Sequence, residues 1–307
     1  MKKVVILSVF SAIFTLLVIA YVCGFYIYRS CVGYYISPQG EIELSEISGN
    51  TVSIMSYNIK CDFPASTDEE RQNSWKNRAE CVSEILNTYK PSIIGMQEVK
   101  RSQAYYMNRF LIGYKSVLVY RENTPLAEST PIFYREDLFE LVKTETFWLS
   151  ETPQTVSISW GSKYHRICTF AVLKDKRTNM EFLVANTHLD NGGDSITINQ
   201  MKVILSKIQD YNLPTLLMGD MNSRIETKTI KEAKTVMSDL GEGCDEEYAG
   251  TVNLFDYSLV KFTRKIDWIF QTPNAFTVNK YKIVQDKVDG RYPSDHFPIY
   301  AEIMFNS

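Results

Sequence analysis

Few of the features that identify a small or repetitive protein are present in this sequence. Six cysteines occur in 307 residues, and none of them shows a CxxC or CxxH spacing. A zinc site is therefore not predicted, and a chain of this length does not need a disulfide scaffold. Residues 51–307 also contain no internal repeat and no Gly/Ser-rich or Pro-rich linker, which excludes a solenoid and favours one domain.

A surplus of basic charge is also lacking. The 33 Lys and Arg residues are outnumbered by 36 Asp and Glu residues, and the net charge is −3. Proteins dedicated to duplex nucleic acid usually carry a basic surplus, so the composition disfavours this class, although a local basic groove is compatible with a balanced total. The 45% apolar and 13% aromatic content supplies enough material for one large core and excludes a disordered chain.

The long hydrophobic run of this chain lies at its start. Lys2 and Lys3 precede an uncharged, mostly apolar stretch at residues 4–28, which ends at Arg29. Because this stretch exceeds the roughly 20 residues that span a bilayer, we expect residues 1–30 to form a transmembrane anchor. A cleaved signal peptide, whose apolar region has about 7–15 residues, is the alternative. The positive charge before the run predicts a cytoplasmic amino terminus and an extracytoplasmic remainder.

The rest of the chain divides into a short connection and one domain. Residues 31–50 combine Gly, Pro and Ser with three glutamates, which predicts a tether. From residue 51 to residue 307, short β-rich runs outnumber helical ones, as in stacked sheets. Apolar spacings of three and four predict helices at 75–89, ended by Pro91, and near 199–211. We expect strands at 52–59, 92–97, 115–119, 131–134, 166–173, 182–187, 215–218, 266–270 and 297–303.

Polar side chains gather at the ends of the expected strands, where they can point into a cleft. Because residues two apart in a strand share a face, Asp220 and Asn222 project together. His188 and His296, two of only three histidines in the chain, also lie at strand ends beside carboxylates. The segments concerned are SYN, QE, NTHLD, GDMN and SDH.

Asp267 resists a purely structural explanation, whereas Trp75, Arg78 and His165 favour one. Asp267 lies between Ile and Trp in an apolar strand, where an unpaired buried carboxylate would cost several kcal/mol. A cationic or protonated partner is therefore expected for it. Trp75 and Arg78, one turn apart on the first helix, are more typical of a helix anchor than of a substrate contact. His165 in YHRI is interpreted as structural.

The strand-end segments also carry a resemblance to a known group of enzymes. SYNIK, GMQEV, NTHLDN, GDMNS, KIDWIF and SDHFPI occur in this order within residues 51–305, and together they resemble the endonuclease/exonuclease/phosphatase superfamily. Each motif alone is weak, whereas six in the superfamily's order form a strong joint signal. The resemblance implies an α+β fold, a four-layer sandwich of two packed mixed β-sheets flanked by helices, here preceded by a transmembrane helix.

The resemblance implies a metal site and a catalytic base. Glu98 resembles the main magnesium ligand, with Asn58 and Asp295 completing the site. Mg²⁺ suits such a site because it needs only one or two protein carboxylates and keeps several waters, and Mn²⁺ is expected to substitute. His296, held in position by Asp267, is the candidate base that activates water, although the superfamily leaves the identity of the base open.

The remaining motif residues resemble groups that contact the nucleophile and the substrate. Asp220 and Asn222 match the pair that positions the nucleophile and a phosphate oxygen, while His188 would donate to the phosphoryl group as negative charge accumulates there. Glu128 stands before an IFYR strand in ESTPIFYR, as the superfamily's glutamate does, and would orient this second histidine.

These inferences predict a membrane-anchored, Mg²⁺-dependent phosphoesterase, in which water attacks phosphorus in line with the leaving oxygen. A catalytically inactive binding module on the same fold is the rival hypothesis. The expected substrate loops, 61–73, 121–128, 191–198 and 237–253, carry no recognisable motif. Nucleic acid, phospholipid and inositol phosphate therefore stay open as substrates. No protein partner is implied.

Overall fold

Two six-stranded mixed sheets pack face to face in the computed structural model, which describes residues 13–24, 35–45, 49–247, 249–256, 258 and 262–306. The first sheet contains, in spatial order, β11 (Phe276–Ile283), β12 (Ile299–Phe305), β1 (Val52–Asn58), β2 (Ile93–Gln97), β4 (Ile132–Arg135) and β3 (Tyr114–Val117). The second contains β5 (Phe139–Trp148), β6 (Ile167–Asp175), β7 (Glu181–His188), β8 (Thr215–Asp220), β10 (Asp267–Gln271) and β9 (Ser238–Asp239).

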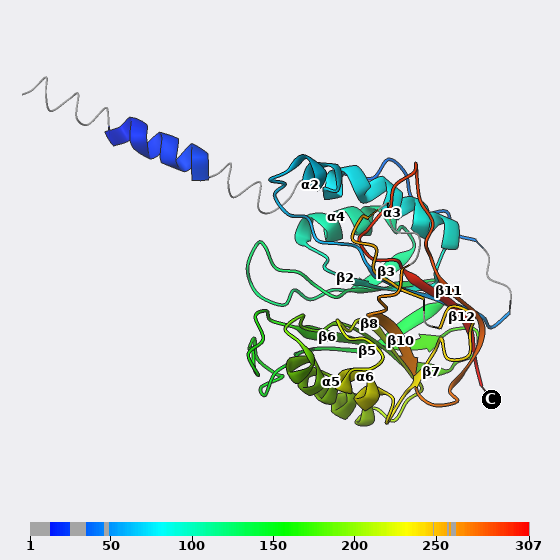
Figure 1. Ribbon diagram of the computed structural model, residues 1–307. Helices are drawn as coiled ribbons and strands as arrows, with labels where there is room; N and C mark the ends of the chain where they lie inside the picture. Colours follow the sequence, from blue (N-terminus) through cyan, green and yellow to red (C-terminus); the bar gives the residue numbers. More distant parts are fainter. Residues whose placement is uncertain are drawn as a thin grey trace, which may run out of the picture.

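Helices cover the outer face of each sheet (Figure 1). The first sheet carries α2 (Asp68–Gln72), α3 (Trp75–Tyr89) and α4 (Arg101–Phe110), and the second carries α5 (Asp194–Gln209) and α6 (Lys228–Ala233). The order of layers is helix, sheet, sheet, helix. The predicted α+β sandwich of two mixed sheets flanked by helices is therefore confirmed.

Apolar residues on both faces of the central strands explain this layering. In β1, Val52 and Ile54 belong to the core between the two sheets, whereas Met55 and Tyr57 pack against the helices of the first sheet. Successive side chains of a strand point to opposite faces, so a strand with apolar residues on both must be covered on both. Trp75 at the start of α3 is fully buried in the outer core.

The structure corrects the limits of one predicted helix and adds elements that the sequence did not indicate. The helix at 75–89 has the predicted bounds, and Lys90 ends it in a left-handed conformation. The second helix begins at Asp194, five residues before the predicted start. The carboxylate of Asp194 accepts hydrogen bonds from the backbone of Lys228 and Thr229, both at 2.9 Å, and so joins α5 to α6. Helix α4 and the edge strands β5 and β11 were not predicted.

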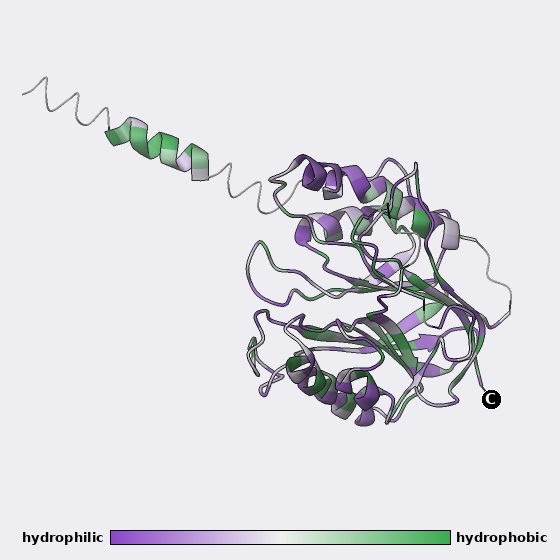
Figure 2. Ribbon diagram, in the orientation of Figure 1, coloured by the Kyte–Doolittle hydropathy of each residue, from purple (hydrophilic) through white to green (hydrophobic). Residues whose placement is uncertain are grey.

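The predicted anchor lies mostly outside the described residues. Residues 13–24 form a helix of largely hydrophobic residues (Figure 2), whereas residues 1–12 and 25–34 are not described. Among the helices that the structure does describe, none is both long and apolar enough to cross a bilayer. The transmembrane helix therefore stays a prediction.

Part of the predicted tether packs on the domain. Within the described segment 35–45, Ile42 is buried, and its backbone N–H donates to the carbonyl of Phe110 at 2.9 Å. The backbone N–H of Glu43 donates to Asn87 Oδ1, also at 2.9 Å, and the ring of Tyr35 meets that of Tyr105 edge to face. Residues 35–45 thus run beside α4 as part of the folded unit.

Two buried amides fix the position of one sheet relative to the other. Gln97 Nε2 on β2 donates to Asn186 Oδ1 on β7 at 2.7 Å. Asn186 Nδ2 donates in turn to the carbonyls of Met96 and Pro131, at 2.7 and 2.8 Å. The sheets approach closely here because Gly95 has no side chain, and a Cβ at this position would lie 2.5 Å from Met218 Sδ. We refer to this contact between the sheets as the amide seam.

Candidate active site

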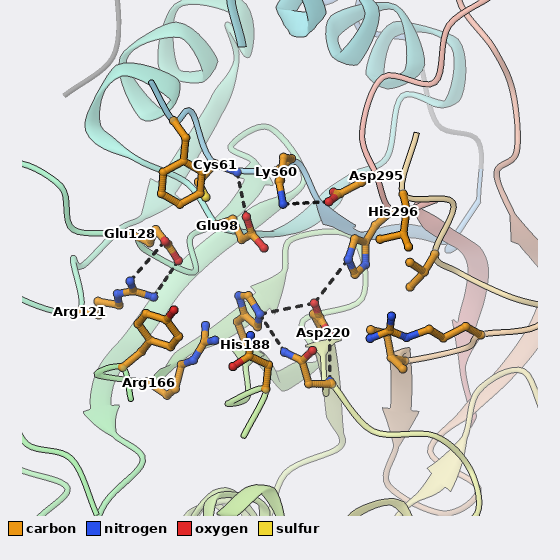
Figure 3. A pocket seen from close by; sticks show the side chains of 18 residues that line it. Lys60, Cys61, Glu98, Arg121, Glu128, Arg166, His188, Asp220, Asp295 and His296 are labelled. Carbon is orange, nitrogen blue, oxygen red and sulfur yellow. Dashed lines mark hydrogen bonds and ion pairs between the residues drawn. The ribbon is translucent and has the colours of Figure 1, made fainter. Parts of the chain in front are cut away.

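The carboxyl ends of parallel strands from both sheets meet at one edge of the sandwich. In the first sheet, β1 and β2 are parallel, and Asn58 pairs in register with Gln97. In the second sheet, β7 and β8 are parallel, and His188 pairs with Asp220, which also pairs with Asp267 on β10. The polar strand ends identified in the sequence therefore converge on one cavity, which is seen in Figure 3.

Left-handed backbone turns direct several of these side chains into the cavity. Lys60, Glu98 and Asn222 have φ values of 57°, 63° and 47°. Non-glycine residues rarely adopt this conformation, and its cost of about 1–3 kcal/mol is tolerated mainly at functional sites. At Glu98 the turn ends β2 directly after Gln97 and brings the carboxylate among the residues that line the cavity.

Asp220 lies at the centre of the cluster and receives contacts from both sheets. Its Oδ2 accepts a hydrogen bond from Asn58 Nδ2 at 3.1 Å, and its Oδ1 accepts one from the backbone N–H of Asn222 at 2.9 Å. His188 Nε2 is 3.4 Å from Oδ2. Burial, and after it the charge of Asp267, raise the pKa of Asp220 to about 7. This carboxyl is therefore poised to exchange a proton near neutral pH.

His296 is held between two carboxylates. Its Nδ1 donates to Asp267 Oδ2 at 2.9 Å, and its Nε2 is 3.8 Å from Asp220 Oδ2. Asp267 thus has the cationic partner that its burial required. Burial alone lowers the pKa of His296, but the charges of Asp267 and Asp220 outweigh it and raise the pKa to about 10. The imidazole is therefore protonated at neutral pH, which does not suit the predicted role of a base acting alone.

Glu98 faces Asp220 across the cavity and shares a hydrogen-bond donor with it. Asn58 Nδ2 donates to Glu98 Oε1 at 3.1 Å as well as to Asp220, and the backbone N–H of Cys61 donates to Glu98 Oε2 at 2.9 Å. Burial alone raises the pKa of Glu98, but the charge of Lys60 and the hydrogen bond from the Cys61 N–H outweigh it and lower the pKa. Glu98 is therefore ionised at neutral pH.

Lys60 was not identified from the sequence, although it follows Asn58 by only two residues. Its ammonium lies 3.0 Å from Asp295 Oδ2. Burial alone lowers the pKa of Lys60, and the charges of Asp295 and Glu98 outweigh it and raise the pKa. Figure 3 shows the ammonium between these two carboxylates. Lys60 therefore places a fixed positive charge in the cavity.

The position of Glu128 differs from the prediction. Its carboxylate accepts two hydrogen bonds from Arg121, at 2.7 and 3.2 Å, whereas His188 Nδ1 is buried and has no hydrogen-bond partner. Glu128 therefore pairs with the planar guanidinium of Arg121 and makes no hydrogen bond that would orient His188. Instead, His188 Nε2 contacts Asn222 Nδ2 at 3.1 Å. Burial, followed by the charge of Arg166, lowers the pKa of His188 well below its ordinary value, so this histidine is neutral.

Arg166, which sequence reasoning missed, is a buried arginine at the wall of the cavity. Its side chain is 5% exposed, and its nearest ion-pair contact is Asp190 Oδ2, at 3.8 Å from Nε. Nε has no hydrogen-bond partner, and Figure 3 shows the guanidinium beside His188. The pairing of β6 with β7 explains this position, because Cys168 lies opposite Thr187. A basic residue at the start of the strand next to His188 is the signal that could have revealed it.

The cavity has a volume of about 290 Å³. Its lining includes both acidic and basic side chains. Phe63 and Leu254 form an apolar rim that adjoins Lys60 and Asp295. The cavity is lined by Lys60, Cys61, Phe63, Glu98, Arg121, Glu128, Tyr164, Arg166, His188, Asn191, Asp220, Asn222, Val252, Leu254, Arg264, Ile266, Asp295 and His296. Asn58 and Asp267 are not among the lining residues, but they contact them. Asn58 donates to Glu98 and Asp220, and Asp267 accepts from His296.

Arg78 has the structural role expected from the sequence. Its guanidinium donates to the carbonyls of Ile59, Lys60 and Pro293, at 2.9, 3.0 and 2.6 Å. The first two follow β1, and the third precedes the SDH segment. Arg78 therefore ties together the two loops that carry Lys60 and Asp295, and acts on the site only through their positions.

The predicted ligand set has the chemistry of a site for a hard divalent cation. Glu98 and Asp295 offer carboxylate oxygens beside the same ammonium group, and Mg²⁺ and Mn²⁺ prefer such ligands. Asn58 is placed differently, because its Oδ1 accepts the backbone N–H of Lys60 at 3.0 Å while its Nδ2 bridges Glu98 and Asp220. In this structure Asn58 therefore orients the carboxylates.

A second group could also hold a metal. Ligand atoms of Asp220, Asp267 and His296, all buried, lie within 4.8 Å of one another. However, the protonated imidazole of His296 already neutralises these carboxylates. We therefore interpret this trio as a proton-transfer group and Glu98 with Asp295 as the metal-binding side of the cavity.

Comparison with known proteins identifies the family. The model of the endonuclease/exonuclease/phosphatase family matches residues 55–296, a range that includes every candidate site residue. The chain therefore belongs to this family, whose members are hydrolases of phosphate esters and generally depend on a divalent metal.

Solved structures of bacterial relatives cover most of the chain. An endonuclease/exonuclease/phosphatase family protein from Bacteroides thetaiotaomicron is 32% identical, with a TM-score of 0.76, over 84% of this chain and 98% of that chain. A mannosyl-6-phosphatase from the same organism is also 32% identical, with a TM-score of 0.75, over 83% of this chain and 100% of that one. The catalytic domain of human Nocturnin, at 17% identity and a TM-score of 0.67, covers 84% of this chain and 94% of its own and shares the fold.

One curated relative matches a smaller part of the chain. An uncharacterised protein of Acanthamoeba polyphaga mimivirus is 26% identical in an alignment of 161 residues that covers 48% of this chain and 59% of that protein. The alignment thus spans little more than half of the relative's length, and it adds no information about the reaction.

Proposed function

We propose that this protein is a divalent-metal-dependent hydrolase of phosphate esters that uses Mg²⁺, with Mn²⁺ able to substitute. The observation that carries the proposal is the convergence of groups from both sheets on Asp220, which contacts Asn58, His188, Asn222 and His296. A carboxyl with a pKa near 7, an imidazolium beside it and a separate oxygen-ligand group form a set suited to activating water against phosphorus.

The residues divide the work of the reaction between them. Arg166 binds oxygens of the phosphate. Asn222 and His188 also contact the phosphate, beside the place from which the water attacks. Asp220 takes the proton of the attacking water, the imidazolium of His296, kept in place by Asp267, stabilises the negative charge that develops, and a solvent water protonates the leaving alcohol oxygen. A bound divalent cation would neutralise charge that develops on the phosphate.

The experiment that tests this function measures hydrolysis of an aryl phosphomonoester and a bis-aryl phosphodiester with Mg²⁺ or Mn²⁺. We expect Glu98→Gln and His296→Asn to abolish hydrolysis in a protein whose circular dichroism is unchanged. Glu302→Gln is the matched control, because Glu302 pairs with Lys280 at 3.5 Å on the far edge of the first sheet. Full activity in Glu98→Gln with either metal would sink the proposal and favour the inactive binding module.

The choice between diester and monoester is supported by one relative. The mannosyl-6-phosphatase, at 32% identity over its whole length, favours a phosphomonoester. The resemblance to nucleases lies below 20% identity and carries only the fold. We therefore propose a phosphomonoester as the first substrate class, with phosphodiesters of nucleic acid or phospholipid as the alternative.

We also propose that residues 1–30 anchor the protein in a membrane, with the catalytic domain outside the cytoplasm. The support is the apolar run at residues 4–28 and the two lysines before it. Separation of membranes from soluble protein, followed by protease treatment of intact cells, tests both parts. Recovery of the whole chain in the soluble fraction would refute the anchor.

A further inference from the structure

Side chains that donate and accept hydrogen bonds line one part of the catalytic cavity. The guanidinium carbons of Arg121 and Arg166 lie 5.3 and 5.1 Å from the centre of the Tyr164 ring. Glu128 and Asn191 complete this part of the lining. We call these five residues the tyrosine wall. Glu128 and Asn191 belong to motifs that the sequence analysis identified, whereas Arg121, Tyr164 and Arg166 do not.

The charge of the tyrosine wall argues against a second phosphate. The charge of Arg121 is neutralised by the two hydrogen bonds to Glu128, and both side chains are nearly buried, at 11% and 12% exposure. A carboxylate in this position repels an anion but accepts hydrogen bonds from hydroxyl groups, since each oxygen keeps a free lone pair. The wall therefore suits a neutral ligand that both donates and accepts hydrogen bonds.

The aromatic ring adds a second feature of the same kind. Tyr164 is 43% exposed, lines the cavity, and contacts two guanidinium groups. A tyrosine presents an apolar face and a polar hydroxyl, which matches a ring-shaped polyol with C–H groups on one face and hydroxyls at its edge. The cavity volume of about 290 Å³ is at the lower end of small-molecule sites, so it suits a small ester.

From these features we infer that the tyrosine wall binds the alcohol part of the substrate and that this alcohol is a polyhydroxylated ring such as a sugar. The inference rests on the proposed function and adds the identity of the group that leaves with the ester oxygen. Glu128 and Tyr164 contact its hydroxyls and determine specificity, while the phosphate lies against Asp220 and Arg166. An aryl or nucleobase-like group would instead lie toward the apolar side chains of Phe63 and Leu254, which also line the cavity.

The test compares two phosphomonoesters that carry the same transferred group on different alcohols. Hydrolysis of a hexose 6-phosphate and of p-nitrophenyl phosphate is measured with the full chain and Mg²⁺. We expect Tyr164→Leu to raise KM for the hexose phosphate about tenfold, the loss of roughly one good hydrogen bond, with kcat little changed. The p-nitrophenyl ester should change less than about threefold. Glu128→Gln should shift specificity in the same direction.

Tyr105→Leu is the matched control. Tyr105 is 38% exposed, and Arg109 lies 5.1 Å from its ring, but both are on α4 outside the cavity. We expect this variant to hydrolyse both esters as the parent protein does. An equal loss on both esters in Tyr164→Leu would overturn the inference, because it would assign Tyr164 to the phosphate or to the fold.

A binding measurement separates the inference from the proposed function. The rise in melting temperature with hexose 6-phosphate is compared with that given by inorganic phosphate. We expect the sugar ester to stabilise the parent protein more than phosphate does, and Tyr164→Leu to remove the difference. If neither ester is hydrolysed but this difference is found, the proposed function fails and the sugar site stands. If both esters are hydrolysed and the two ligands stabilise equally, only the sugar site fails.

Discussion

Replacement of Arg166 by methionine should reduce catalysis without weakening the fold. The buried guanidinium of Arg166 has no hydrogen-bond partner at Nε, and its ion-pair contact is 3.8 Å away. It therefore contributes little to stability, because the cost of its desolvation is not compensated. Asp190 keeps its hydrogen bonds from Ser162 Oγ and the backbone of Gly192, at 2.6 and 2.7 Å, when the arginine is removed. We therefore expect the free energy of unfolding to change by less than about 1 kcal/mol.

The catalytic effect follows from the contact that Arg166 is proposed to make. A hydrogen bond between a guanidinium and a phosphate oxygen contributes about 1.5–3 kcal/mol, and about 1.4 kcal/mol corresponds to a factor of ten. Arg166→Met should therefore lower kcat/KM by about 10- to 150-fold. Steady-state rates on p-nitrophenyl phosphate give this ratio, and urea denaturation gives the stability.

Arg135 provides a control with the opposite signature. It is equally buried, but it donates to Asp137 Oδ1 at 3.0 Å and to the carbonyl of Ser45 at 2.7 Å, away from the cavity. Arg135→Met should destabilise the protein by about 1–3 kcal/mol and leave kcat/KM unchanged. If Arg166→Met behaves like Arg135→Met, with lost stability and retained kcat/KM, the guanidinium of Arg166 is structural and the reasoning is wrong.

Three further predictions concern stability. Lys265→Met should lower the free energy of unfolding by about 3–5 kcal/mol, because Asp239, 3.2 Å from the ammonium, is left buried without a cation. Urea denaturation measures this, and adding Asp239→Asn should restore part of the loss. Burial alone raises the pKa of Glu145, but its hydrogen bond from Lys207 outweighs it and lowers the pKa. Glu145 therefore stabilises the fold above its unfolded pKa of about 4.3, and this contribution is lost as the pH falls. Melting temperatures across acidic pH should decline less steeply in Glu145→Gln, and parallel curves would contradict this account. Asn186→Leu should lower the temperature at which activity is lost more than the temperature at which circular dichroism reports unfolding, because it removes the amide seam, and equal shifts would argue against the seam.

Much of the fold was predictable because its central strands have clear hydrophobic patterns. Strands such as β1, β7 and β8 are buried on both faces and appear as short apolar runs. The edge strands β5 and β11 were missed because one face of each is open to solvent and carries charged residues such as Lys143 and Lys280. Their hydrophobic pattern is too weak for recognition without the neighbouring strand.

The catalytic residues were predictable where they belong to strand ends. Asp220, Asn222 and His296 follow or precede strands with clear patterns, and strand pairing brings them together. The partner of Glu128 was not predictable from the sequence. Arg121 lies in the same loop, and only the folded loop shows that the carboxylate pairs with Arg121 and not with His188. Arg166 belongs to no motif. Its place in the site follows only from the pairing of β6 with β7, the strand that ends at His188.

The activity of the catalytic cavity depends on the alignment of the two sheets, which the amide seam fixes. Glu98 comes from one sheet and Asp220 from the other, and they are linked through Asn58. A displacement of one sheet along the other by the rise of one residue, about 3.3 Å, would move Glu98 away from Asp220, so both sheets could stay folded while the chemistry stops. Pressure or mild heat should therefore abolish the activity of this protein before its sheets unfold.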